Sequence, residues 1–168
     1  MILKIVNDIK AAVSEFAYNK DDIEVRTGDI YDVNEMPSVK YPVVIVSQGK
    51  HEFDAQNDYL YYNLTLFYVD NMVGMEDRDW SDSLDETRAL SATRKRCGTD
   101  NILETSILAI QSAGTKCLLS ALYKLEDKYV LAGAMQVVPF KEKFNDVCAG
   151  VYVTIKVREE LNSCEIVM

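Results

Sequence analysis

The sequence predicts an α+β fold in which a mostly antiparallel β-sheet packs against an N-terminal helix and a central helix. Two segments predict the sheet, because residues 42–48 and 58–70 are rich in β-forming side chains and about nine residues separate them, which suits a long antiparallel hairpin. Apolar residues at helical spacing, in residues 2–18 and again after Asn101, predict the two helices that cover this sheet.

The N-terminal segment is expected to form an amphipathic helix over residues 2–18. Its apolar side chains recur at intervals of three and four residues: Ile2, Ile5, Val6, Ile9, Ala12, Val13 and Phe16. A short alternating strand at residues 23–26 follows. A polar loop from Gly28 to Glu35 then leads into the strand at residues 42–48.

The strand at residues 58–70 carries five aromatic rings, and neither of its two faces is polar. Alternation places one set on one face, Leu60, Tyr62, Leu64, Leu66 and Tyr68, and a second set on the other, Tyr59, Tyr61, Asn63, Thr65, Phe67 and Val69. A strand of this kind is covered on both faces, by its own domain or by a neighbouring subunit. The pattern therefore favours assembly over catalysis.

Residues 71–100 form an acidic insert with a predicted helix of its own. Ser83 and Glu86 match a capping box, and the helix that they begin is expected to stop at Gly98. A second capping signature at Asn101 opens the central helix, which is expected to run to Leu125. Gly114 interrupts this helix, which predicts a close packing contact there.

The last third of the chain predicts two more strands. Residues 128–139 form a strand with a kink or bulge at Gly133, and residues 140–146 form a loop. The final strand, residues 147–158, is expected to be half-buried: Val151, Val153, Ile155 and Val157 face one way, and Tyr152, Thr154, Lys156 and Arg158 the other. Residues 159–168 are a C-terminal tail, disordered or docked on a neighbour, and residues 1–168 form one domain.

Composition excludes several classes of function. The net charge of −9 argues against binding to a nucleic-acid backbone, which needs clustered Lys and Arg. No apolar run approaches the roughly 20 residues of a membrane helix, and no signal-peptide core is present, so a protein made in a cytoplasm without membrane contact is expected. Four widely spaced cysteines and one histidine do not form a zinc motif, and Cys117 and Cys148 have apolar, core-like surroundings.

Motifs that carry chemistry are weak throughout. His51 is the only histidine, with no specific nucleophile or orienting partner, and the acids of residues 76–86 lack the spacing of a calcium loop. No phosphate loop occurs, so no enzyme activity, cofactor or metal is predicted. The basic run after Arg88 is either a solvated helix face or a contact for an acidic partner. Candidate contacts with other subunits or proteins are Gln48, His51, Phe53, Tyr59, Tyr61, Trp80, Arg94, Lys95 and Arg96.

Three segments together resemble a known family: Tyr41-Pro-Val-Val-Ile-Val-Ser-Gln-Gly49, Leu60-Tyr-Tyr-Asn-Leu-Thr-Leu-Phe-Tyr-Val-Asp70, and residues 144–157. They resemble tail-completion or tail-terminator-like proteins of tailed bacteriophages, especially crAss-like and Bacteroides phages. The resemblance covers about half of the chain and implies an α+β subunit of a non-catalytic ring that connects head and tail. The insert at residues 71–100 is longer than in the simplest members.

The resemblance implies a virion protein whose partners are other copies of itself, in a homo-oligomeric ring, and the adjacent portal, connector and tail proteins. Genomic DNA would pass through the ring without specific binding, and we hypothesise that the excess acidic charge faces that channel. Residues 49–57 and 71–100 are expected to contact adjacent subunits or rings. The alternatives are another non-catalytic phage assembly or host-interaction module and, third, a small α+β enzyme that uses His51.

Overall fold

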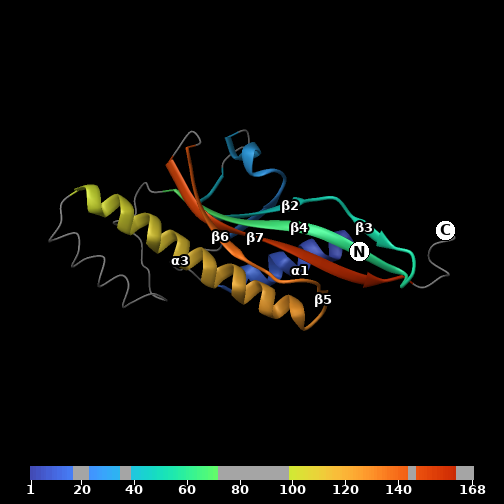
Figure 1. Ribbon diagram of the computed structural model, residues 1–168. Coiled ribbons are helices and arrows are strands. Elements are labelled where there is room, and N and C mark those ends of the chain that lie inside the picture. Colours follow the sequence, from blue (N-terminus) through green and yellow to red (C-terminus); the bar gives the residue numbers. More distant parts are fainter. Residues whose placement is uncertain (17–22, 35–38, 72–98, 144–146, 162–168) are drawn as a thin grey trace.

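The structure is a computed structural model that describes residues 1–16, 23–34, 39–71, 99–143 and 147–161. Within these residues, two α-helices lie on one face of a seven-stranded sheet (Figure 1). Every pairing in the sheet is antiparallel except that of β1 with β2. The predicted α+β fold, with a mostly antiparallel sheet packed against an N-terminal and a central helix, is therefore confirmed.

The centre of the sheet consists of β2 (Val43–Gln48), β4 (Tyr59–Asn71) and β7 (Val147–Glu160), in that order. Strands β2 and β4 pair antiparallel, as the hairpin prediction requires. On its other side, β4 pairs with β7 along its whole length, from Tyr59 opposite Glu160 to Asn71 opposite Cys148. Strand β4 is thus hydrogen-bonded on both edges, and its side chains are the ones that decide what each face of the sheet presents.

The connection between the two hairpin strands is shorter than predicted. Part of residues 49–57 forms a further strand, β3 (Glu52–Asp54), which pairs with the start of β4. The turn is confined to residues 55–58. The N–H of Gly49 donates to the carbonyl of Asn63 at 2.8 Å, so the chain stays against β4 between β2 and β3. The backbone groups of a long two-stranded arm thereby find partners within the arm.

The predicted strand at residues 23–26 is observed as β1 (Glu24–Thr27), which runs parallel to β2. The polar loop predicted after it contains a short 3₁₀-helix, η1 (Ile30–Asn34). Ile30 of this turn is buried in a small cluster with Val43 and Val69, on the face of the sheet that the two α-helices do not cover. Figure 1 shows η1 above one end of that face.

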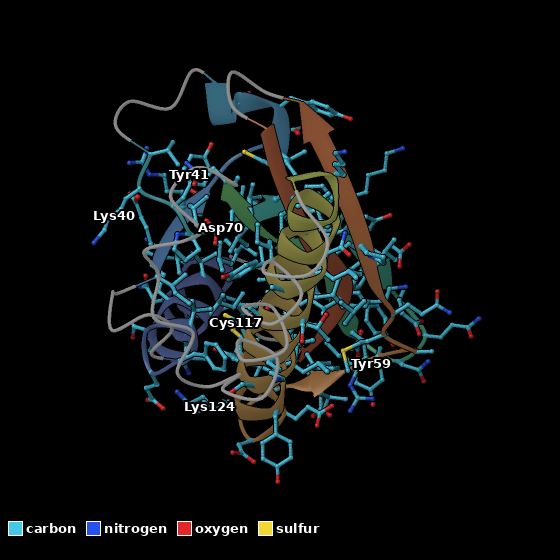
Figure 2. The ribbon with its side chains drawn as sticks, turned by 90° about the vertical axis from the view of Figure 1, so that its left-hand side faces the viewer. Lys40, Tyr41, Tyr59, Asp70, Cys117 and Lys124 are labelled. Carbon is cyan, nitrogen blue, oxygen red and sulfur yellow. The ribbon has the colours of Figure 1, made fainter. Side chains whose placement is uncertain are left out.

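Helix α1 (Ile2–Ser14) buries the predicted apolar stripe, including Ile5, Ile9 and Val13. Its observed end lies four residues before the predicted one. Helix α3 (Thr99–Glu126) begins two residues before its predicted capping signature and packs along the same face of the sheet. Its buried residues recur at helical spacing: Ala109, Ile110, Ala113, Cys117, Leu118, Ala121, Leu122 and Leu125. Cys117, which is labelled in Figure 2, is one of these buried residues of the helix.

Gly114 is the point of closest approach between α3 and the sheet. A Cβ atom built there lies 2.6 Å from Cδ1 of Tyr68 and 2.8 Å from Cγ2 of Val151. Real Cβ atoms essentially never come so close to another heavy atom. The predicted close contact at Gly114 is confirmed, and it fixes the middle of α3 over β4 and β7.

The strand predicted at residues 128–139 is interrupted more strongly than a single bulge would require. It is divided into β5 (Val130–Leu131) and β6 (Val137–Lys143), both paired with β7. Gly133, with φ of 81°, lies in the interruption as predicted. The register places five residues, 132–136, opposite only three, 154–156. The predicted loop at 140–146 is wrong in its first part, because β6 continues to Lys143.

Two predicted segments have bounds that the structure changes. Asn71 belongs to β4 and residues 99–100 to α3, so the insert is at most residues 72–98, which lie outside the described part of the chain. The tail predicted from residue 159 begins later, because Glu159 and Glu160 are the last residues of β7. Residues 162–168 also lie outside the described part.

The two faces of β4 have different environments, which the sequence could not assign. The face toward the helices, the inner face, is fully covered: Leu64, Leu66 and Tyr68 are 0–1% exposed. We define the outer face as the opposite side of β4 and β7, which consists of Tyr59, Tyr61, Asn63, Thr65, Phe67, Tyr152, Thr154, Lys156 and Arg158. Apart from Thr154, which is exposed, its members are half-buried. Among the described residues, η1 and its flanks cover one end of this face only.

Candidate interaction surfaces

An aromatic cluster occupies the end of the outer face nearest η1. The ring of Phe67 in β4 lies 5.4 Å from that of Tyr152 in β7 and 6.2 Å from that of Phe140 in β6, measured between centroids. Phe140 and Tyr152 are 6.3 Å apart. All three rings are half-buried, and they come from three neighbouring strands. Such rings present a large apolar area that loses little conformational entropy when a partner covers it.

The opposite end of the outer face combines tyrosines with cations. The Nζ atom of Lys156 lies 5.0 Å from the centroid of the Tyr61 ring, and the guanidinium of Arg158 lies 4.4 Å from that of Tyr59. Lys156 also forms a salt bridge with Glu52. Between the two ends, the hydroxyl groups of Thr65 and Thr154 are within hydrogen-bonding distance at 3.2 Å. The contacts with Tyr61, Glu52 and Tyr59 hold Lys156 and Arg158 flat against the sheet.

The predicted contact residues are divided between the two sides of the sheet. Tyr59 and Tyr61 belong to the outer face, with part of each ring exposed. Gln48 pairs with Leu64, and Phe53 pairs with Leu60, so both residues belong to the inner side of the sheet. Both are nevertheless exposed, because they lie at the margin of that side. His51 is exposed, and its ring meets that of Tyr62 edge-on at 4.9 Å.

Other predicted contacts lie outside the described residues, namely Trp80, Arg94, Lys95 and Arg96. Sequence reasoning missed Phe140 as part of a surface, because it placed this residue in a loop. It also recognised Tyr152, Lys156 and Arg158 as one face of a strand without joining them to Tyr59 and Tyr61. The missing information is the register of β4 against β7, which pairs residues almost a hundred positions apart.

Tyr62 is a structural residue and not part of the exposed surface. Its hydroxyl donates to Oε2 of Glu159 at 2.7 Å, across the β4–β7 pair. Burial, together with this carboxylate, raises the pKa of Tyr62 to about 12. The phenol therefore stays protonated at neutral pH and serves to anchor the end of β7.

A cavity of about 290 Å³ lies between α1 and the C-terminal end of α3. Four of its charged groups form two ion pairs. Lys124 contacts Glu15 (Figure 2 shows Lys124 near the end of α3), and Lys128 donates to Asp8 at 2.9 Å. The hydroxyl of Tyr129 also donates to Asp8, at 2.5 Å. The hydrogen bond from Tyr129 and, to a smaller extent, the one from Lys128 hold the pKa of Asp8 below its usual value of 3.8. The cavity is therefore lined by ion pairs that join two helices.

The described residues offer little for catalysis or metal binding. In the part of the chain that the structure describes, no group of three or more His, Cys, Asp or Glu residues is placed to hold a metal ion. Cys117 and Cys148 are buried, as predicted, and burial raises the pKa of the Cys117 thiol to about 12. This thiol is protonated at neutral pH and is not a nucleophile.

Comparison with known proteins adds no relative. Neither the family models nor the curated protein sequences contain a match to this chain. Across the described ranges, no helix combines the length and the apolar character that crossing a membrane requires.

Proposed function

We propose that this protein is a non-catalytic structural component of a tailed bacteriophage, which assembles into a ring at the head–tail interface as a connector or tail terminator. The observation that carries the proposal is the outer face of the sheet, where the described residues of one copy cover a broad aromatic surface only in part. Tyr, Phe and Arg are the residues enriched at protein–protein interfaces. A neighbouring subunit would supply the cover that the helices supply on the inner face.

The segments that carry the sequence resemblance also support this proposal. They fall on β2, β4 and β7, which are adjacent in the sheet although β7 is distant from the other two in the chain. A resemblance spread over three neighbouring strands concerns one continuous structural unit. It is the kind of likeness expected from a shared scaffold, since it includes no catalytic motif.

The charge of the chain suits passage of DNA without adhesion. With a net charge of −9, a ring of such subunits repels the phosphate backbone overall. The proposed partners are therefore further copies of this chain, the adjacent portal or connector and tail proteins, and genomic DNA only as a passing polymer. The proposed location is the virion.

Electron microscopy of the purified full-length protein tests the proposal directly. We expect closed rings with a central opening, and a single larger species in sedimentation velocity. In a phage that carries this gene, its deletion should give filled heads and separate tails, because the joining ring is absent, and the gene supplied in trans should restore complete particles. Normal particles without the gene, or a protein that stays monomeric at all concentrations, would contradict the proposal and favour a host-interaction module.

A further inference from the structure

We infer that the outer face of the sheet in one copy packs on the exposed side of α3 in the next copy. This inference rests on the proposed ring and names the two surfaces that form it. The two surfaces lie on opposite sides of the molecule, because the helices occupy one side of the sheet and the outer face is the other (Figure 1). Each copy thus carries both halves of the contact.

The exposed side of α3 has an apolar stripe that the chain's own described residues leave uncovered. We define the α3 stripe as Leu108, Thr115, Leu119 and Tyr123. Its apolar side chains are 64%, 48% and 74% exposed at Leu108, Leu119 and Tyr123, respectively. Four residues separate Leu119 from Tyr123, so they lie one above the other on the helix surface. Three residues after Tyr123, the exposed acid Glu126 continues the stripe, and the exposed Asp127 follows it at the edge of the cavity beside α1.

The two surfaces match in length and in the order of their chemistry. At 1.5 Å per residue, the span on α3 from Leu108 to Glu126 is about 27 Å. At about 3.3 Å per residue, the span on β4 from Phe67, in the aromatic cluster, to Tyr59, which stacks on Arg158, is about 26 Å. The outer face changes along this length from aromatic rings to a charged end of mixed sign, where Lys156 is paired with Glu52 and Arg158 stacks on Tyr59, and the α3 stripe changes from apolar side chains to acids.

The charged ends of the two surfaces also lie at the same end of the molecule. Gly114, in the middle of α3, contacts Val151, and the chain that leaves α3 enters β5, which pairs with Val157 and Arg158. Helix α3 and strand β7 therefore run in the same direction. A second copy can place its acids over Arg158 without being reversed, so successive copies add head to tail. Contacts of this heterologous type close into a ring when the rotation between successive copies closes, and they form an open filament when it does not.

Arg158 has the capacity to bind a further carboxylate. Its described carboxylate contact, with Glu160, is 3.6 Å long, which exceeds a hydrogen bond. A guanidinium has five N–H donors, so donors remain for Glu126 or Asp127 of a neighbouring copy. A nucleic acid fits less well, because Glu52, Asp54 and Glu160 accompany the two cations and leave no basic surface.

A mixing experiment with two variants tests the inference. Thr154→Arg places a long cation in the middle of the outer face, and Leu119→Asp places a charge in the α3 stripe; both positions are exposed, so both variants should fold. Alone, each variant should lose the ring and sediment as a monomer. Mixed at high protein concentration, they should form a one-to-one dimer that does not grow, because one intact outer face then meets one intact stripe. Thr27→Arg, at an exposed position of β1, is the matched control and should keep the ring.

The outcomes separate this inference from the proposed function. If wild-type protein forms rings and both variants do so equally well, or if the mixture does not associate, the inference is wrong and the ring proposal stands. If Leu119→Asp keeps the ring but lowers the melting temperature, residues 72–98 of the same chain cover the stripe, and the inference is again wrong. A wild-type protein that never assembles overturns both.

Discussion

At the scale of single residues, Asp8 shows how one carboxylate joins two elements. It accepts hydrogen bonds from Tyr129 and Lys128, which lie just after α3, while Asp8 itself belongs to α1. Burial, together with the hydrogen bond to Asp8, raises the pKa of Tyr129 to about 12, and the hydrogen bonds from Tyr129 and Lys128 lower the pKa of Asp8. The helices of the inner layer are thus held at one end by contacts that require Asp8 to be ionised.

The lowered pKa of Asp8 predicts a pH-dependent contribution to stability. A carboxyl group with a lower pKa in the folded state stabilises the fold above its unfolded value, here 3.8, and loses this contribution as pH falls through the folded value. Wild-type protein should therefore exceed Asp8→Asn in free energy of unfolding at pH 7, and the difference should shrink below pH 3.8. Urea denaturation of both proteins at several pH values measures it. A difference that is the same at pH 7 and pH 3 would contradict the assignment.

At the scale of elements, the contact between α3 and the central strands depends on the absence of a side chain at Gly114. Alanine is favoured over glycine within a helix by about 1 kcal/mol, and an extra methyl group in a filled core costs about 1–3 kcal/mol. The clash here is with a fully buried ring, Tyr68, and with Val151, neither of which is a flexible surface group. The steric cost should therefore exceed the gain in helix propensity.

We accordingly expect Gly114→Ala to lower the free energy of unfolding by about 1–2 kcal/mol, against the direction of helix propensity. The control is Ser120→Ala in the same helix, at a half-buried position that is not part of the α3 stripe. This change should be neutral or slightly stabilising. Chemical denaturation of the three proteins gives the comparison, and a stabilised Gly114→Ala variant would show that the ring of Tyr68 moves aside easily.

The elements also show what sequence reasoning can and cannot reach. Helix α1, strand β4 and the buried side of β7 were predictable because alternation and helical spacing are local properties of the chain. The division of residues 128–143 into β5 and β6 was not, because it depends on where each half pairs with β7. The strand β3 was missed for the same reason: its three residues are a strand only because β4 lies beside them.

At the scale of the whole molecule, the same limit applies to the candidate surfaces. The sequence predicts that β4 is covered on both faces, but it does not tell which face the helices take. The structure assigns the inner face to α1 and α3, and leaves Tyr59, Tyr61 and Phe67 on the outer face with Tyr152 and Arg158. Their grouping depends on pairings between distant parts of the chain. Trp80 and the basic residues of the insert, the other predicted contacts, lie outside the described residues.

The irregular passage from β5 to β6 determines which side chains the third strand contributes to each face. The chain between β5 and β6 has two more residues than the segment of β7 opposite it. Because side chains alternate between the faces and two is an even number, Leu131 and Val137 lie on the same face of the sheet, and both pack against the helix layer. Phe140 consequently stays with Phe67 and Tyr152. Removal of Gly133 and Ala134 together would leave an uninterrupted ladder in the same phase, whereas removal of Ala134 alone would leave one surplus residue and force a bulge or a slip. The shorter deletion should therefore melt at a lower temperature than the longer one, and the opposite order in differential scanning calorimetry would refute this view of the strand.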